Sequence, residues 1–273
     1  MRESSAFVPG HISGFFRIHD ESDNPLKIGS RNCGPCIDNG VKTTIEIENS
    51  DALEVEVYID GERDEANTTL TAVSNLLESY EETPHIRIEH SVQAPIGAGY
   101  GMSGAGTLGA VFALSDALDF ELDKEEMLAE AHKAEVMCKS GLGDVGPQVL
   151  GGLVIGLRPG AHPFGSWERI ELEGDWSVVC ATLGGMSTSE FLGVSENRKR
   201  SKEMGELAMK DLLIEKTMES FMRVSKKFTI GLNVYDDEFL ETLNEISKSC
   251  PKGASAVMLG KAIFAPVHKS EVD

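Results

Sequence analysis

The sequence predicts an α+β protein made of two packed halves, and three observations support this prediction. Its 273 residues are long for one small domain and comfortable for two halves. Hydrophobic residues make up 41% and charged residues 26%, which is the balance of a globular protein with a sizeable core. Segments with strand and helix periodicity follow one another irregularly, whereas a regular βαβ array would alternate them.

In the first half, an apolar stretch over residues 6–17 is broken by the letters PGHISG. Alternation of apolar and polar residues predicts strands at 42–48, 53–59 and 86–92. Helical spacing of leucine, valine and small residues predicts helices at 67–80, 103–119 and 124–139. A buried strand is expected at 149–157.

A shift in composition near residues 160–174 indicates a soft domain boundary, so we expect domains at 1–172 and 173–273. The second half is predicted to contain strands at 176–183 and 256–265 and helices at 205–227 and 236–249. The helix at 205–227 lies in a Met-rich stretch, which we interpret as core or as a homodimer contact.

The charge balance limits the partners. Asp and Glu total 45 against 25 Lys and Arg, so the formal net charge is −20. Such a chain is unsuited to nucleic acid and to anionic membrane surfaces, both of which attract clustered cations. No apolar run approaches the ~20 residues that span a bilayer, and the first ten residues do not have the pattern of a signal peptide. We therefore expect a cytoplasmic protein whose anionic ligands, if any, are bound by local features.

A Gly-rich loop over residues 95–110 is the strongest local signal. Its small residues let backbone N–H groups approach an anion, and the helix that follows adds its positive end. Ser103 and Thr107 could offer hydroxyl groups to a phosphate or its Mg²⁺. The same small residues would also serve a close helix–helix contact.

The loop also contains the spacing G-x-G-x-x-G at Gly99, Gly101 and Gly104, which is typical of dinucleotide binding. A NAD-type oxidoreductase is therefore an alternative. The preceding strand speaks against it, because it alternates polar and apolar residues, whereas a central parallel strand is almost continuously apolar.

A second Gly-rich loop, over residues 140–146, follows a helix that carries Glu135 and contains Asp144. A carboxylate pair near a phosphate loop suits Mg²⁺ coordination and orientation of an attacking hydroxyl group. Taken alone, Glu135 fits a solvated helix residue and Asp144 fits a turn residue. Cys33 and Cys36 have the spacing of a redox pair, but a turn at 37–40 is expected after them instead of a helix, so we interpret them as two thiols flanking a Gly-Pro turn or as an adventitious disulfide.

Taken in order, these segments resemble the GHMP kinases, the family of galactokinase, homoserine kinase and mevalonate kinase. The resemblance rests on FVPGHISGFF, on GYGMSGAG after Pro95, on SGLGD and, weakly, on GASAVMLG, and so spans nearly the whole chain. It departs from the family at His11, where a lysine is common, and at Met102, which replaces the first serine of the loop.

The resemblance implies two α+β domains, the second ferredoxin-like, with the active site in the cleft between them, and it implies ATP and Mg²⁺. Asp144 and Ser103 would be catalytic, and Ser103 and Glu135 would hold the metal. His11, Ser140 and Gly141 would bind substrate. The ATP phosphates would lie on Pro95, Gly99, Gly101, Met102, Ser103, Gly104, Ala105 and Gly106.

The wording of the motifs is most similar to archaeal members of the family that phosphorylate pantoate to 4-phosphopantoate on the route to coenzyme A. Another acceptor, such as homoserine or mevalonate, and a non-catalytic binding module remain alternatives. Candidate partners for a substrate carboxylate are Arg17, Arg31, Arg198 and Arg200, each of which could equally be a surface arginine. His11 could equally be a loop histidine that caps a backbone group.

Overall fold

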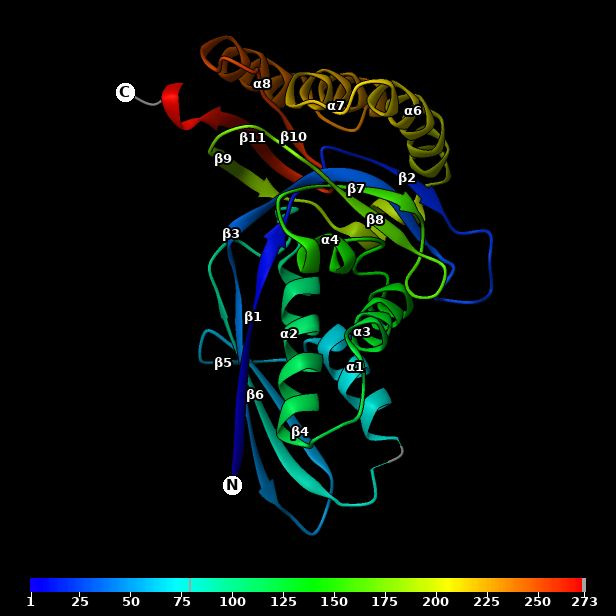
Figure 1. Cartoon of the computed structure of the whole chain (residues 1–273), viewed down its shortest axis with the longest axis vertical. Helices are drawn as coiled ribbons and strands as arrows, with labels where there is room; N and C mark the ends of the chain where they lie inside the picture. Colours follow the sequence, from blue (N-terminus) through cyan, green and yellow to red (C-terminus); the bar gives the residue numbers. More distant parts are fainter. Residues whose placement is uncertain (79, 272–273) are drawn as a thin grey trace.

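The computed structural model describes residues 1–78 and 80–271 and has two sheets and eight α-helices in this part of the chain (Figure 1). Ser79, within the predicted helix 67–80, and Val272 and Asp273, within the predicted second domain, lie outside the described residues. The α+β class is confirmed. No helix in residues 1–78 and 80–271 is long and apolar enough to cross a membrane.

The first sheet has eight strands in the order β5-β4-β6-β3-β7-β8, with β1 and β2 also paired to β3. All pairs are antiparallel except β4 with β6. Its strands are β1 (Arg2–His11), β2 (Phe15–His19), β3 (Gly29–Asn49), β4 (Glu54–Ile59), β5 (Glu62–Asp64), β6 (Pro84–Val92), β7 (Leu153–Arg158) and β8 (Ser166–Ile170). A largely antiparallel sheet is not the parallel sheet that a dinucleotide-binding fold requires, so the G-x-G-x-x-G alternative is wrong.

The 21-residue strand β3 joins both parts of this sheet. The turn expected at 37–40 is instead an irregularity within the strand, where Pro9 pairs with Gly40 but Gly10 pairs with Ile37. The thiols of Cys33 and Cys36 are both free. Burial raises the pKa of Cys36 to about 12, so the thiolate that redox chemistry needs does not form near neutral pH.

Helix α2 (Met102–Ala117) runs along the first sheet, with α1 (Asn67–Leu77) and α3 (Lys124–Cys138) packed beside it (Figure 1). Small residues allow α2 to be buried almost all round. At Gly109, for example, a Cβ atom would lie 2.6 Å from Thr43 Oγ1 of the sheet. The short helix α4 (Val145–Leu150) follows the second Gly-rich loop, and it takes in the first residues of the strand predicted at 149–157.

The second sheet has the antiparallel order β10-β11-β9 and is covered by helices (Figure 1). Its elements are β9 (Trp176–Gly185), α5 (Thr188–Gly193), α6 (Ser195–Ile214), α7 (Met218–Leu232), α8 (Asp237–Ser249), β10 (Ser255–Val257) and β11 (Gly260–His268), followed by a short 3₁₀ turn (Lys269–Glu271). Three strands among the described residues are one fewer than a ferredoxin-like unit has.

Two predictions in this half are wrong in detail. The helix predicted at 205–227 is two helices, because Thr217 caps α7 by accepting a hydrogen bond from the Ser220 N–H. The strand predicted at 256–265 is a hairpin that turns at Met258 and Leu259, where Leu259 has a φ of +62°.

Aromatic rings join the two halves. Phe16 of β2 packs edge-on against Phe191 of α5 and Phe228 of α7, with ring centroids 5.9 and 5.4 Å apart. One buried core therefore extends from the first sheet to α7 and β11. The predicted boundary between residues 172 and 173 falls between β8 and β9, and the division into two domains stays a prediction.

Candidate active site

The first Gly-rich loop connects β6 to α2 and contains three glycines with positive φ, at Gly97, Gly99 and Gly101. Gly99 is the most constrained, because a Cβ atom there would lie 2.7 Å from the Met258 carbonyl oxygen. The turn of the GASAVMLG segment therefore packs directly against this loop.

Hydrogen bonds from both halves of the molecule hold the loop. The His11 N–H donates to the Tyr100 carbonyl at 3.0 Å, and Gln148 Nε2 donates to the Gly101 carbonyl at 2.8 Å. The Met186 N–H donates to the Gly97 carbonyl at 3.0 Å. No side chain caps α2, so its first N–H groups remain available to an anion, and the positive end of the helix dipole lies beside them.

These elements surround a cavity of about 340 Å³. The predicted site residues on its wall are Gly99, Gly101, Met102, Ser103, Gly104, Glu135, Ser140, Gly141 and Asp144. Four others lie off this wall: Pro95 lines a shallow hollow beyond β6, Ala105 faces the core, Gly106 packs against His90, and His11 is fully buried. Gly106 lines the second cavity described below, and the phosphate contacts of Pro95, Ala105 and Gly106 stay predictions.

Glu135 projects from the last turns of α3 into the space between the two Gly-rich loops. It is 1% exposed, and its pKa is raised well above the usual value by burial and then by the negative charge of Asp144. A Cβ atom on Gly104 would lie 2.9 Å from Glu135 Oε1, and one on Gly141 would collide with the same carboxylate. Glycine at both positions lets the backbone of each loop approach the acid.

The donor set fits a magnesium ion. Glu135 Oε2 and Gln148 Oε1 are buried oxygens with no hydrogen-bond partner among the described residues, and both side chains lie beside Gly104. Ser103 and Glu135 line the cavity. Residues 1–78 and 80–271 contain no group of three or more His, Cys, Asp and Glu side chains that could hold a metal. Mg²⁺ does not need one, since it commonly binds one or two protein oxygens together with phosphates and water.

Asp144 stands at the start of α4, with its side chain 27% exposed to the cavity. His11 Nδ1 lies 2.7 Å from Asp144 Oδ1 and donates to it, because a carboxylate can only accept. The imidazole therefore lies behind the carboxylate and not in the cavity wall. The expectation that His11 caps a backbone group is wrong, and its contact with substrate stays a prediction.

The remaining wall contains polar residues that the sequence did not single out. Ser13, Ser30 and Asn32 line the cavity, and Asn32 Nδ2 donates to Ser13 Oγ at 3.3 Å and to the Gly143 carbonyl at 3.0 Å. Asn32 thereby ties β3 to the loop that carries Asp144. Gln148 was also missed. These residues come from separate segments with no periodicity of their own, so only the tertiary fold brings them together.

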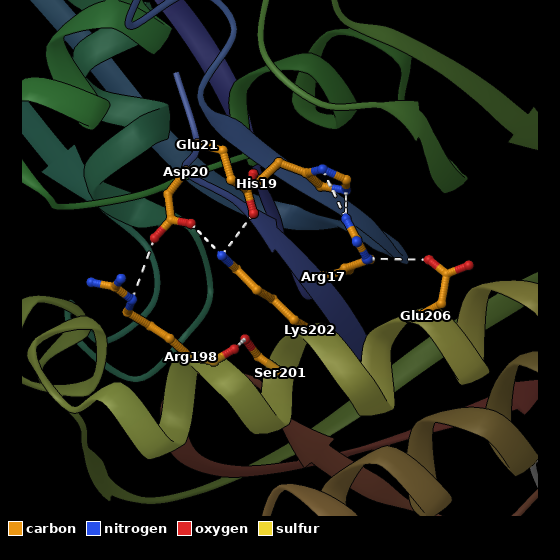
Figure 2. A network of polar contacts seen from close by, with 8 residues as sticks. All are labelled: Arg17, His19, Asp20, Glu21, Arg198, Ser201, Lys202 and Glu206. Atoms are coloured by element: carbon orange, nitrogen blue, oxygen red, sulfur yellow. Dashed lines mark hydrogen bonds and ion pairs between the residues drawn. The ribbon is translucent and has the colours of Figure 1, made fainter. Parts of the chain in front are cut away.

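The arginines considered for a substrate carboxylate lie elsewhere. Figure 2 shows Arg17 directed at Glu206 and Arg198 directed at Asp20, with N···O distances of 3.1 and 3.3 Å. Arg200 pairs with Glu196 at 3.0 Å, and neither it nor Arg31 lines the cavity. Arg17, Arg198 and Arg200 are thus paired with acids outside the cavity.

A second cavity of about 510 Å³ lies between β6 and the start of α1. It shares Ile96, Met102 and Ser103 with the first cavity, so the two hollows meet at the N-terminus of α2. This arrangement provides one space on each side of the anion-binding loop.

The site combines a Gly-rich loop that opens a buried helix with a buried glutamate and a partly exposed aspartate, which is the arrangement expected of a GHMP-type small-molecule kinase. Residues 67–152 match the family described as GHMP kinases N terminal domain. The chain is 32% identical to the pantoate kinase of Thermococcus kodakarensis, over 98% of this chain and 89% of the relative. It is 31% identical to the pantoate kinase of Methanocaldococcus jannaschii, over 98% and 94%.

A solved structure described as a phosphotransferase related to the CoA biosynthesis pathway superposes with a TM-score of 0.89 at 29% identity, covering 98% of this chain and 89% of that one. The chain belongs to the pantoate kinase family.

Proposed function

We propose that this protein transfers the γ-phosphate of ATP to the 4-hydroxyl of pantoate, giving 4-phosphopantoate for coenzyme A biosynthesis in the cytoplasm. The observation that carries this proposal is the near-complete match to pantoate kinases, together with a cavity that combines the phosphate loop, Glu135 and Asp144. A mevalonate kinase of Pyrococcus abyssi is 29% identical over only 61% of this chain and 47% of its own length, so the mevalonate alternative has weaker support.

ATP would lie across the junction of the two cavities. The second cavity, lined by apolar Val41, Ile59 and Val92 and by polar Asn67 and Thr68, suits a nucleoside. The phosphate chain would then cross the N–H groups of Gly101 to Gly104 and enter the first cavity. Ser103, which lines both cavities, stands where the chain would pass.

Glu135, Ser103 and Gln148 would hold Mg²⁺. A bound ion would supply positive charge against the negative charge that develops on the phosphate during transfer. Without a cation, the carboxylate of Glu135 is buried beside a second acid, which accounts for its raised pKa.

Pantoate would occupy the part of the first cavity lined by Ser13, Ser30, Asn32 and Asp144. Asp144 would accept a hydrogen bond from the attacking hydroxyl and orient it towards the γ-phosphate. Because His11 Nδ1 donates to one carboxylate oxygen, the other remains available to the substrate.

Steady-state release of ADP tests this function. With MgATP, pantoate should stimulate release strongly, whereas homoserine and mevalonate should leave it near the background rate. Stimulation by one of the other alcohols alone would keep the kinase class and overturn the acceptor, and failure of all three would overturn the function.

A further inference from the structure

The first cavity has a charge imbalance that its proposed ligands would worsen. Its wall carries two acids, Glu135 and Asp144, and the whole chain has a net charge of −20. ATP and pantoate are both anions. Among the described residues of the wall, the one Lys, Arg or His is Lys139.

Lys139 occupies an unfavourable backbone conformation. It ends α3 with a φ of +55° and a ψ of 32°, and its N–H donates to the carbonyls of Glu135 and Val136. Glycine or asparagine usually fills a left-handed position at a helix C-terminus, because other residues pay a steric cost there. Local backbone geometry thus gives no reason for a lysine, and strain of this kind is often retained for function.

The ammonium group of Lys139 is available. Its side chain is exposed, and its ammonium group forms no hydrogen bond or ion pair with residues 1–78 or 80–271. Lys133, two turns earlier on the same helix, contrasts with it, because Lys133 pairs with Glu130 at 3.6 Å. A cation is also electrostatically favoured at the C-terminal end of a helix.

The neighbours of Lys139 indicate which anion it meets. Ser140, the next residue, accepts a hydrogen bond from Thr68 Oγ1 at 2.9 Å, and Thr68 lines the second cavity. Cys138 contacts Thr71 of α1. The C-terminus of α3 therefore lies against the start of α1, between residues of the first cavity and residues of the second.

We propose that Lys139 binds the phosphate chain of the nucleotide. The inference rests on the proposed function for the direction in which the nucleotide lies. The ammonium group would offset phosphate charge from the side opposite the N-terminus of α2, and it would thereby compensate locally for the acidic protein.

Equilibrium binding of MgATP and of AMP, measured without pantoate, tests this proposal. Lys139→Gln should weaken MgATP binding about tenfold, as expected for one partly exposed charge-assisted hydrogen bond, and leave AMP binding within about twofold. Lys133→Gln, a matched change on the same helix, should alter neither. Lys139→Gly relieves the backbone strain and should melt no lower than the wild type while losing the same affinity for MgATP, which separates ligand binding from folding.

Unchanged MgATP affinity in Lys139→Gln would overturn the inference. A rise in the KM for pantoate with no change in ATP binding would also overturn it, since the lysine would then bind the carboxylate of pantoate. The effect of Lys139→Gln on MgATP binding does not depend on which alcohol accepts the phosphate. A wild-type protein that binds MgATP but does not phosphorylate pantoate would contradict the proposed function and leave the Lys139 result interpretable.

Discussion

At the scale of single residues, the site depends on carboxylates in different surroundings. Glu135 is buried between two glycines with an unpaired oxygen, whereas Asp144 is partly exposed and held by His11. This difference suits the first to a metal and the second to a substrate hydroxyl. The resemblance to a family indicated both acids. The contacts of Gln148 and Asn32 and the contact from His11 to Asp144 join residues 47 to 133 positions apart, so they could not be predicted.

Asp144→Asn tests the catalytic assignment. The amide cannot accept the hydroxyl proton, so we expect turnover to fall by ~10²-fold or more, with MgATP binding within a few fold of wild type. Turnover in single-cycle experiments and nucleotide binding by calorimetry would be compared. Loss of both together would indicate a structural role for Asp144 and contradict the assignment.

His90 gives a prediction for stability. Its imidazole is buried between Thr43 and Thr69, and burial lowers its pKa to about 4, against a slight opposing effect of Asp64. The unfolded chain, with an ordinary histidine pKa near 6.5, binds the extra proton between these values, so the free energy of unfolding falls as the pH drops from about 6.5 to 4.

Between pH 7 and pH 5, the free energy of unfolding should fall by about 2 kcal/mol more in the wild type than in His90→Gln, as measured by urea denaturation. His19, whose pKa is also lowered to about 4 but which is only half-buried, provides a comparison that should show a smaller effect. An equal loss on acidification in His90→Gln and wild type would contradict the assignment.

Among the secondary-structure elements, helices were predicted well where the spacing of apolar residues and a capping residue at the first turn mark the same segment. Helix α3 begins at a capping box formed by Asp123 and Glu126, and α8 begins at Asp236, whose side chain accepts from the Phe239 N–H. The errors have physical causes. No glycine or proline marks the break between α6 and α7, and the Gly-Pro inside β3 has the signature of a turn although the strand continues through it.

Gly99→Ala tests the packing of the phosphate loop on the β10–β11 turn. A methyl group would meet the Met258 carbonyl in addition to the strain of a positive φ, so we expect a loss of about 2–4 kcal/mol in stability and weaker nucleotide binding. Gly97→Ala is the matched control, because Gly97 also has a positive φ but no atom lies within 4 Å of its Cβ position. Equal effects of the two changes, by denaturation, would contradict the packing argument.

At the scale of the whole molecule, the cavity depends on contacts between the first sheet and the C-terminal half. The loop is held by Met186 and Met258 as well as by His11, and the aromatic core continues from Phe16 to Phe228. The α+β class and the order of the elements followed from periodicity. The shared core could not be predicted, because it arises from residues far apart in the sequence, such as Phe16 with Phe191 and Phe228.

A continuous core predicts cooperative unfolding. Despite the domain boundary expected near residue 172, we expect one calorimetric transition in which the van't Hoff and calorimetric enthalpies agree. Phe228→Ala, which removes a ring at the junction, should lower the single melting temperature by several degrees. Two separate transitions in the wild type would show that the halves fold independently.

If ATP phosphorylates the 4-hydroxyl of pantoate, the chemical structure of the product shows it directly. After incubation with MgATP and pantoate, phosphorus-31 NMR with proton correlation should show a new monoester coupled to the methylene protons at C4, formed in equal amount with ADP. No organic phosphate, or a phosphate coupled to the C2 proton instead, would contradict the account.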